Sequence, residues 1–418
     1  MVKFILLPAI IAVIVHQIEG QCFTTKDDKE PKQIGRKSLY GGEQEFSLNL
    51  LRDINQLNPE GNIFFSPYST YHALLLAYFI SAGKTEQFLK KALRLDPGLD
   101  KIDLKTAYKV DKYLTKGSSL EGDYEFSNAN RIYVNTGIKV RDCVSDLFTD
   151  EFESIDFGTK PDESRLIINK WVENQTHNMI RDLLPPGSID QTTNLALVNA
   201  GYFKGSWKYE FKESETKEEV FHVSPEKRVL VKMMHMEAML NHDVSEELGA
   251  YVLELPYKGE KISMYILLPP FMKQDGIAKT LAKLTPSTFQ KVMQNLTNDY
   301  GKTVNLQLPK FSLENTIEMT PILESLGVGN LFTSEADFSF LSDSHLTLGA
   351  GVHKAKIVVN EKGSEAAAAS ALIGVRTMDD ETVTYRCNHP FMFLLYSKET
   401  STIAFIGIVR NPEQFLSL

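Results

Sequence analysis

A run of small residues near the C-terminus restricts what this chain can fold into more than any other feature. Residues 363–371 read GSEAAAASA, and no proline lies between Glu361 and Met378. Alanine-rich runs usually favour a helix, but two flanking glycines and the β-formers from Val375 onward leave an extended conformation open. Every residue of an extended run could donate a ladder hydrogen bond. Its alternate side chains, Ser364 among them, would form one face of small groups that could slide between two existing strands, with Glu365 on the other face.

A single arginine follows this run. Arg376 is the only basic residue between Lys362 and Arg386, and acidic residues come soon after it. A lone arginine in an exposed loop suits trypsin-like proteases, whose specificity pocket carries an aspartate. Taken alone, the arginine could equally be an incidental residue of a polar surface loop.

Three motifs here resemble those of the serpin family of serine protease inhibitors. EKGSEAAAAS at 361–370 is similar to the hinge of a serpin reactive-centre loop, YRCNHPFMFLL at 385–395 to the C-terminal signature, and FIGIVRNP at 405–412 to the terminal strand. The resemblance, to secreted, inhibitory, antithrombin-like members, continues through nearly all of residues 43–412. It implies a serpin fold with a large central β-sheet, surrounding helices and an exposed reactive-centre loop. The hinge residues that it implies are Glu361, Gly363, Ser364, Glu365, Ala366, Ala367, Ala368 and Ala369.

The resemblance implies an inhibitor of the suicide type rather than an enzyme. In serpins a protease attacks the exposed loop and forms an acyl-enzyme, and the cut loop then inserts as a strand into the central sheet. The chain has no nucleophile elbow, P-loop or zinc-binding helix motif, so we expect no catalytic residues. A non-inhibitory serpin, acting as a carrier or chaperone, is the alternative. The small residues of the hinge argue against it, because such members usually carry bulky or charged residues there.

The reactive bond can be placed by counting along the family pattern. About 16 residues after Glu361 lies Thr377, whereas about 14 residues before Pro390 lies Arg376. The loop is thus one residue short on its hinge side. We assign the bond to Arg376–Thr377, because an arginine has a strong pocket in secreted trypsin-like proteases, and keep Thr377–Met378 as the alternative.

The resemblance also implies residues that control the opening of the central sheet. Each has an ordinary structural interpretation as well: a serine N-cap before a proline, a core tryptophan in a strand, and a buried histidine with satisfied hydrogen bonds. The residues implied for the shutter and breach regions are Ser66, Ser69, Asn199, Trp207 and His353.

Hydrophobic periodicity predicts helices and strands in irregular order, which indicates an α+β fold in one domain. Before it we expect a signal peptide at residues 1–20 and a flexible extension at 21–42, with the serpin domain at 43–418. The chain should therefore be secreted and extracellular. The main predicted elements are helices at 68–82, 103–116 and 167–184, and strands at 195–211, 229–239, 250–269, 304–311 and 352–359.

Composition and short motifs narrow the partners. The net charge of -9 argues against general nucleic-acid binding, and no second apolar run is long enough for a membrane span. The spacing of Cys22, Cys143 and Cys387 suits no metal site, and we assign no disulfide. Asn174 and Asn295 begin glycosylation sequons. We expect a monomer without cofactor or metal that forms a covalent complex with a trypsin-like secreted serine protease; overall resemblance suggests an arthropod haemolymph cascade controlling melanisation.

A row of lysines lies on the predicted helix at 103–116, with Gly117 as its stop. The helix occupies the place of the serpin helix that binds heparin in antithrombin-like members. The alternative is a solvated face with lysines favoured near a helix C-terminus. We expect no acid on that face to relieve the like charges, so a heparin-like glycosaminoglycan could act as an activator by lying along the row. The row consists of Lys101, Lys105, Lys109, Lys112 and Lys116.

Overall fold

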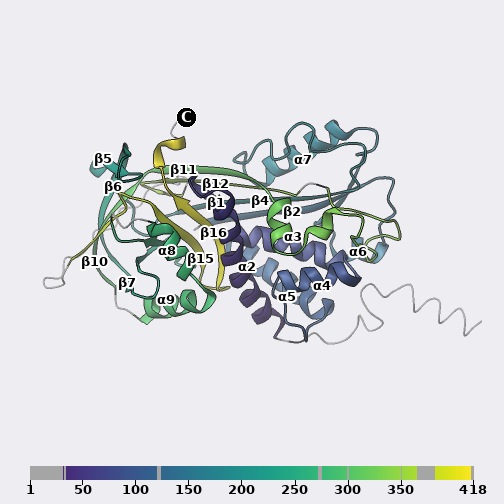
Figure 1. Ribbon diagram of the computed structural model, residues 1–418, viewed down its shortest axis with the longest axis horizontal. Helices are drawn as coiled ribbons and strands as arrows, with labels where there is room; N and C mark the ends of the chain where they lie inside the picture. Colours follow the sequence, from purple (N-terminus) through teal and green to yellow (C-terminus); the bar gives the residue numbers. More distant parts are fainter. Residues whose placement is uncertain are drawn as a thin grey trace, which may run out of the picture.

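The structure is a computed structural model that describes residues 32, 34–119, 124–271, 275–298, 301–349, 351–364 and 382–415. It confirms the α+β class, with helices gathered around three β-sheets (Figure 1). The helices are α2 (Gly35–Leu57), α3 (Pro67–Ile80), α4 (Gly83–Ala92), α5 (Lys101–Ser119), α6 (Asp142–Leu147), α7 (Pro161–Gln175), α8 (Gly276–Lys283), α9 (Pro286–Asn298) and α10 (Thr320–Ser325).

The sheet that contains the first residues of the predicted hinge has six strands and is called the central sheet. Its strand order is β11 (Phe311–Glu318), β12 (Val352–Asn360), β13 (Gly363–Ser364), β4 (Leu195–Ser206), β2 (Tyr124–Asn135) and β3 (Phe152–Ile155). A second six-stranded sheet has the order β1 (Ile63–Phe65), β16 (Thr402–Val409), β15 (Phe391–Ser397), β9 (Ile262–Leu268), β8 (Ala250–Pro256) and β7 (His242–Ser245). A four-stranded sheet contains β14 (Val383–Arg386), β10 (Lys302–Pro309), β6 (Arg228–Leu240) and β5 (Lys217–His222).

Helix α3 lies at the centre of the molecule, between the central sheet and the second sheet (Figure 1). All of its residues are buried, which explains why its sequence is apolar on every side. Ser66 caps the helix by accepting a hydrogen bond from the Ser69 amide, and Pro67 occupies the first helical position. The predicted helix at 68–82 is therefore confirmed.

Several predicted boundaries differ from the structure, and the two largest differences concern helices. Helix α2 begins at Gly35, inside the segment expected to be a flexible extension, because Leu39 is buried on its inner face. The helix predicted at 167–184 ends at Gln175, since His177, Asn178 and Asp182 have left-handed backbone conformations that a helix cannot contain. Buried apolar residues continue through this turn region, and they made the helical pattern look longer than it is.

The cysteines need one correction. Cys143, in α6, is disulfide-bonded, which contradicts the prediction of no disulfide. Cys387 is a free, buried thiol, as a small hydrophobic core residue would be. The predicted signal peptide and Cys22 lie outside the described residues.

The predictions of no membrane span and no metal site can be examined only in the described ranges. No helix there is both long and apolar enough to cross a membrane. The same ranges contain no group of three or more potential metal-binding side chains.

Candidate functional site: an opening in the central sheet

Strands β12 and β4 are neighbours over only part of their length. They pair in parallel from Val352 and Val198 to Lys356 and Tyr202. Beyond this point the chain turns back after β12, and the two residues of β13 pair with both strands, antiparallel to each. The central sheet is therefore already open at one end, and the first residues of the predicted hinge fill the gap.

Ser364 is the last described residue before the loop and is completely buried. It pairs with Val359 of β12 and Gly205 of β4. Its hydroxyl lies 2.6 Å from the Tyr257 hydroxyl, beneath the sheet. A segment that continued this strand would place every second side chain on the same confined side of the sheet.

Gly363 is required by its surroundings. Its φ is 154°, and a Cβ atom there would lie 2.0 Å from the Gly205 carbonyl oxygen. No side chain can be accommodated against a backbone at that distance. The glycine that precedes the small-residue run is therefore a steric necessity for the turn between β12 and β13.

The turn between β12 and β13 is fixed by side chains from distant segments of the chain. The Glu361 carboxylate is buried, pairs with the Lys310 ammonium at 2.8 Å and accepts a hydrogen bond from the Thr216 hydroxyl at 2.8 Å. Burial alone would raise the pKa of Glu361, but these two partners outweigh it and hold the pKa below its usual value. The Trp207 indole donates to the Asn360 carbonyl at 2.9 Å and stacks on Tyr257. Glu361 and Trp207 thus anchor the start of the loop.

A polar cluster holds the closed part of the sheet together. The Ser66 amide donates to His353 Nε2 at 3.0 Å, and His353 Nδ1 contacts Asn199 Oδ1. The Asn199 amide in turn donates to the Ser69 hydroxyl at 2.6 Å. The four residues predicted for the shutter therefore form one connected cluster, which links α3 to β12 and β4.

Because the Ser66 amide donates to Nε2, the neutral His353 ring must carry its proton on Nδ1. His353 is fully buried, and this burial lowers its pKa to about 3. A proton added at Nε2 would break the bond to Ser66 inside the cluster. This cluster is thus held by a histidine that stays neutral.

This burial predicts acid sensitivity. With a folded pKa below the unfolded value, His353 contributes stability that is complete above pH 6.5 and is lost as the pH falls towards 3, by up to about 4–5 kcal/mol. In His353→Gln, the free energy of unfolding, measured in urea at several pH values, should fall less steeply across this range. The exposed His345→Gln is the matched control and should behave like the parent. A His353→Gln curve parallel to that of the parent would contradict the assignment.

Sequence reasoning missed several members of both clusters. Asn128 and Asn130 of β2 accept hydrogen bonds from the Ser69 hydroxyl, at 2.6 and 3.2 Å. Tyr257, Lys310 and Thr216 around the turn were also missed. The only local signal for Asn128 and Asn130 is their spacing, because residues at alternate positions of a strand lie on the same face. The other three come from segments whose proximity only the topology reveals.

The predicted reactive residues lie outside the described part of the chain. Residues 365–381 contain Glu365, the four alanines Ala366–Ala369, Arg376 and Thr377. The chain is described again from Thr382, which leads into β14 at the edge of the four-stranded sheet. The cleavage site therefore stays a prediction from the sequence.

Helix α5 carries the lysines of the predicted row, but the structure differs from the prediction in three ways. Lys101 is buried and pairs with Glu86 at 3.2 Å, so it cannot extend an exposed row. Lys112 pairs with the Glu151 carboxylate at 2.6 Å, so an acid does relieve this face. The helix also continues past Gly117 to Ser119. Lys109 is exposed, Lys105 is half-buried, and the side chain of Lys116 is outside the description.

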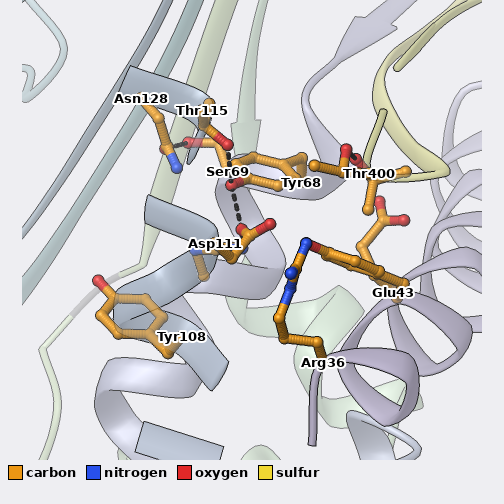
Figure 2. A network of polar contacts seen from close by, with 12 residues as sticks. Arg36, Glu43, Tyr68, Ser69, Tyr108, Asp111, Thr115, Asn128 and Thr400 are labelled. Carbon is orange, nitrogen blue, oxygen red and sulfur yellow. Dashed lines mark hydrogen bonds and ion pairs between the residues drawn. The ribbon is translucent and has the colours of Figure 1, made fainter. Parts of the chain in front are cut away.

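The inner face of α5 is attached to α3 by buried polar groups. The Tyr68 hydroxyl lies between Asp111 and Thr115 (Figure 2). It is 2.5 Å from the Asp111 carboxylate and 3.1 Å from the Thr115 hydroxyl, and His72 also contacts Asp111 at 3.2 Å. Burial would raise the pKa of Asp111, but the hydrogen bonds from His72 and Tyr68 outweigh it and lower the pKa. Val110 is 37% exposed, because Ala107, Tyr108 and Asp111 form the buried face of the helix.

Comparison with known proteins agrees with this architecture. The family model described as "Serpin (serine protease inhibitor)" matches residues 42–412. Serine protease inhibitor 88Ea from Drosophila melanogaster is 38% identical over 395 residues, which cover 90% of this chain and 92% of that protein. The structure of Serpin48, described as a highly specific serpin of the insect Tenebrio molitor, has a TM-score of 0.77 and 28% identity, and covers 90% of this chain and 98% of its own. The structure of human thyroxine-binding globulin matches with a TM-score of 0.80 and 26% sequence identity. The match covers 90% of this chain and 99% of that one.

Proposed function

Because the chain belongs to the serpin family, we propose that it is a secreted suicide inhibitor of trypsin-like serine proteases, cut at Arg376–Thr377. The single observation that carries the proposal is β13. Two hinge residues occupy the gap between β12 and β4, and they end in Ser364, from which the small-residue run continues. A cut loop could extend this strand without forming a new nucleus, since its first backbone pairs already exist.

Trapping of the protease follows from strand geometry. About 15 loop residues at ~3.3 Å each would carry a protease attached to Arg376 roughly 50 Å along the sheet. The sheet can accept them only if β12 and β4 separate where they now pair, and the shutter cluster on Ser66, Ser69, Asn199 and His353 lies there. We propose that this cluster controls the opening.

The proposal is tested by incubating the mature chain with trypsin. We expect a covalent complex that survives SDS and contains one copy of each protein, with a loop fragment released on denaturation. Quantitative cleavage without any SDS-stable complex would instead support the alternative of a non-inhibitory carrier or chaperone. That alternative has a specific basis, because thyroxine-binding globulin shares the fold.

Secretion and glycosylation belong to the same proposal. Asn174, in the last turn of α7, and Asn295, on α9, are both exposed and available for attached sugars. Similarity to inhibitors from two insects, Drosophila and Tenebrio, supports an arthropod context. We propose a haemolymph protease of a melanisation cascade as the target. Adding the protein to arthropod plasma should then delay melanisation, and Arg376→Ala should not.

We propose that a glycosaminoglycan activates the inhibitor through a shorter row of lysines, without Lys101. The row consists of Lys105, Lys109 and Lys116, and of Lys112 once its ammonium group leaves the Glu151 carboxylate. Changing all four to alanine should lower the salt concentration at which the protein elutes from heparin, because fewer counterions are released on binding. It should also remove any acceleration of inhibition by heparin. The matched control loses the same charge elsewhere on the surface: Lys84, Lys227, Lys283 and Lys302 to alanine. If the parent does not bind heparin at ~50 mM salt, or both variants elute together, the row is only a solvated face.

A further inference from the structure

A cavity of about 270 Å³ lies between three segments that take no part in the hinge or the shutter. It is lined by α2, by α4 with the turn that follows it, and by the turn after α10. The floor is apolar, because Phe46 and Ala92 are buried there. Phe88 and Leu326 form its walls, and 41% of the Phe88 side chain is exposed.

Two cations stand at the rim of this cavity, Lys91 and Arg94. Arg94 pairs with Glu45 at 3.0 Å, but both side chains are more than 40% exposed, and exposed ion pairs of this kind contribute little. Lys91 is exposed and forms no ion pair within the described ranges. An anion entering the cavity could therefore contact both cations after breaking only one weak pair.

The backbone at Arg94 is unusual for an arginine. The Arg94 amide donates to the Lys91 carbonyl and the Leu95 amide to the Lys90 carbonyl, which is the Schellman ending of a helix. Its left-handed position usually holds glycine, yet Arg94 occupies it with a φ of 52°. The Arg94 side chain is 41% exposed, so it gains little burial that would compensate this strain. Residues held in such conformations are concentrated at ligand-binding and functional sites.

We propose that this cavity binds an amphipathic carboxylate, whose alkyl or aryl part lies on Phe46, Phe88 and Leu326 and whose carboxylate lies between Lys91 and Arg94. A concave, mostly apolar site with a few polar groups at its mouth is the usual form of a small-molecule site. Guanidinium groups bind carboxylates through two parallel hydrogen bonds, which gives Arg94 a reason to be there. The inference does not depend on protease inhibition, because none of these residues belongs to the hinge or the shutter.

The test is calorimetric titration of the full chain with decanoate and, separately, with 1-decanol. We expect saturable decanoate binding with a dissociation constant below about 1 mM, and at least about tenfold weaker binding of the uncharged alcohol. Bound decanoate should also raise the melting temperature in a concentration-dependent way. No saturable binding of decanoate, or equal binding of 1-decanol, would overturn the proposal.

Arg94→Gly separates a ligand-binding role from a purely structural one. Because glycine suits the left-handed position, this variant should melt at the same or a higher temperature than the parent without ligand. It should nevertheless bind decanoate about tenfold more weakly. Phe88→Ser should also weaken binding, whereas Lys84→Ala, an exposed change on the same helix outside the cavity, should not. If Arg94→Gly and Phe88→Ser bind decanoate like the parent, the cavity is not the site.

Discussion

Replacing Arg376 with alanine is expected to slow the inhibition of trypsin by about 10³-fold. In the complex the arginine would pair with the buried aspartate of the protease pocket, and removing one partner of a buried charge pair costs about 3–5 kcal/mol. The measurement is the second-order rate constant for loss of trypsin activity. Arg376→Lys should retain most of the rate, because it preserves the charge.

The matched control for this change is Arg386→Ala, since Arg386 is exposed on β14 and is the next basic residue along the chain. It should inhibit like the parent. Sequencing the released C-terminal fragment distinguishes the two candidate bonds: a fragment beginning at Thr377 supports Arg376–Thr377, and one beginning at Met378 supports the alternative. An Arg376→Ala protein that inhibits trypsin as fast as the parent would show that the arginine is not the recognised residue.

The second large effect is expected at Ser364. Its side chain lies in a fully buried space beside Tyr257, so Ser364→Arg would place a charge beneath the sheet at a cost of several kcal/mol. The loop should then be cut at a normal rate but insert slowly. We expect the number of inhibitor molecules consumed per trypsin inactivated to rise at least about tenfold, the barrier to insertion having risen by more than about 1.4 kcal/mol.

Glu365→Arg is the control for this experiment. It adds the same side chain one position later, where the alternation of an extended strand turns it to the opposite face. We expect it to inhibit with the stoichiometry of the parent. If Ser364→Arg and Glu365→Arg have equal stoichiometries, whether both unchanged or both raised, the strand-insertion account is wrong at this position.

The sequence predicted those parts of the site that depend on local pattern. The Ser66 cap, the apolar helix α3 and the small residues Gly363 and Ser364 all follow from short-range geometry. The resemblance identified His353 and Asn199, which the structure brings into one cluster with Ser66 and Ser69. What that cluster does during insertion stays a prediction.

The parts that the sequence could not predict depend on contacts between distant segments. Lys101 has the spacing of an exposed lysine, but the neighbouring α4 supplies Glu86 and turns it into a buried ion pair. Lys112 meets Glu151, which lies between α6 and β3. In the same way, the partners of Glu361 lie between β10 and β11 and directly before β5, and no periodicity within 361–370 could have indicated them.

The central claim is that the strand begun by Gly363 and Ser364 can be extended between β12 and β4 once the loop is cut. The most direct measurement is the melting temperature of the protein before and after a protease that it does not inhibit cuts the loop. About ten new backbone hydrogen bonds, each contributing roughly 1 kcal/mol, should raise the melting temperature by at least about 10 °C. Ser364→Arg should show a much smaller rise after the same cut. A cleaved parent protein that melts at the temperature of the intact one would contradict the account.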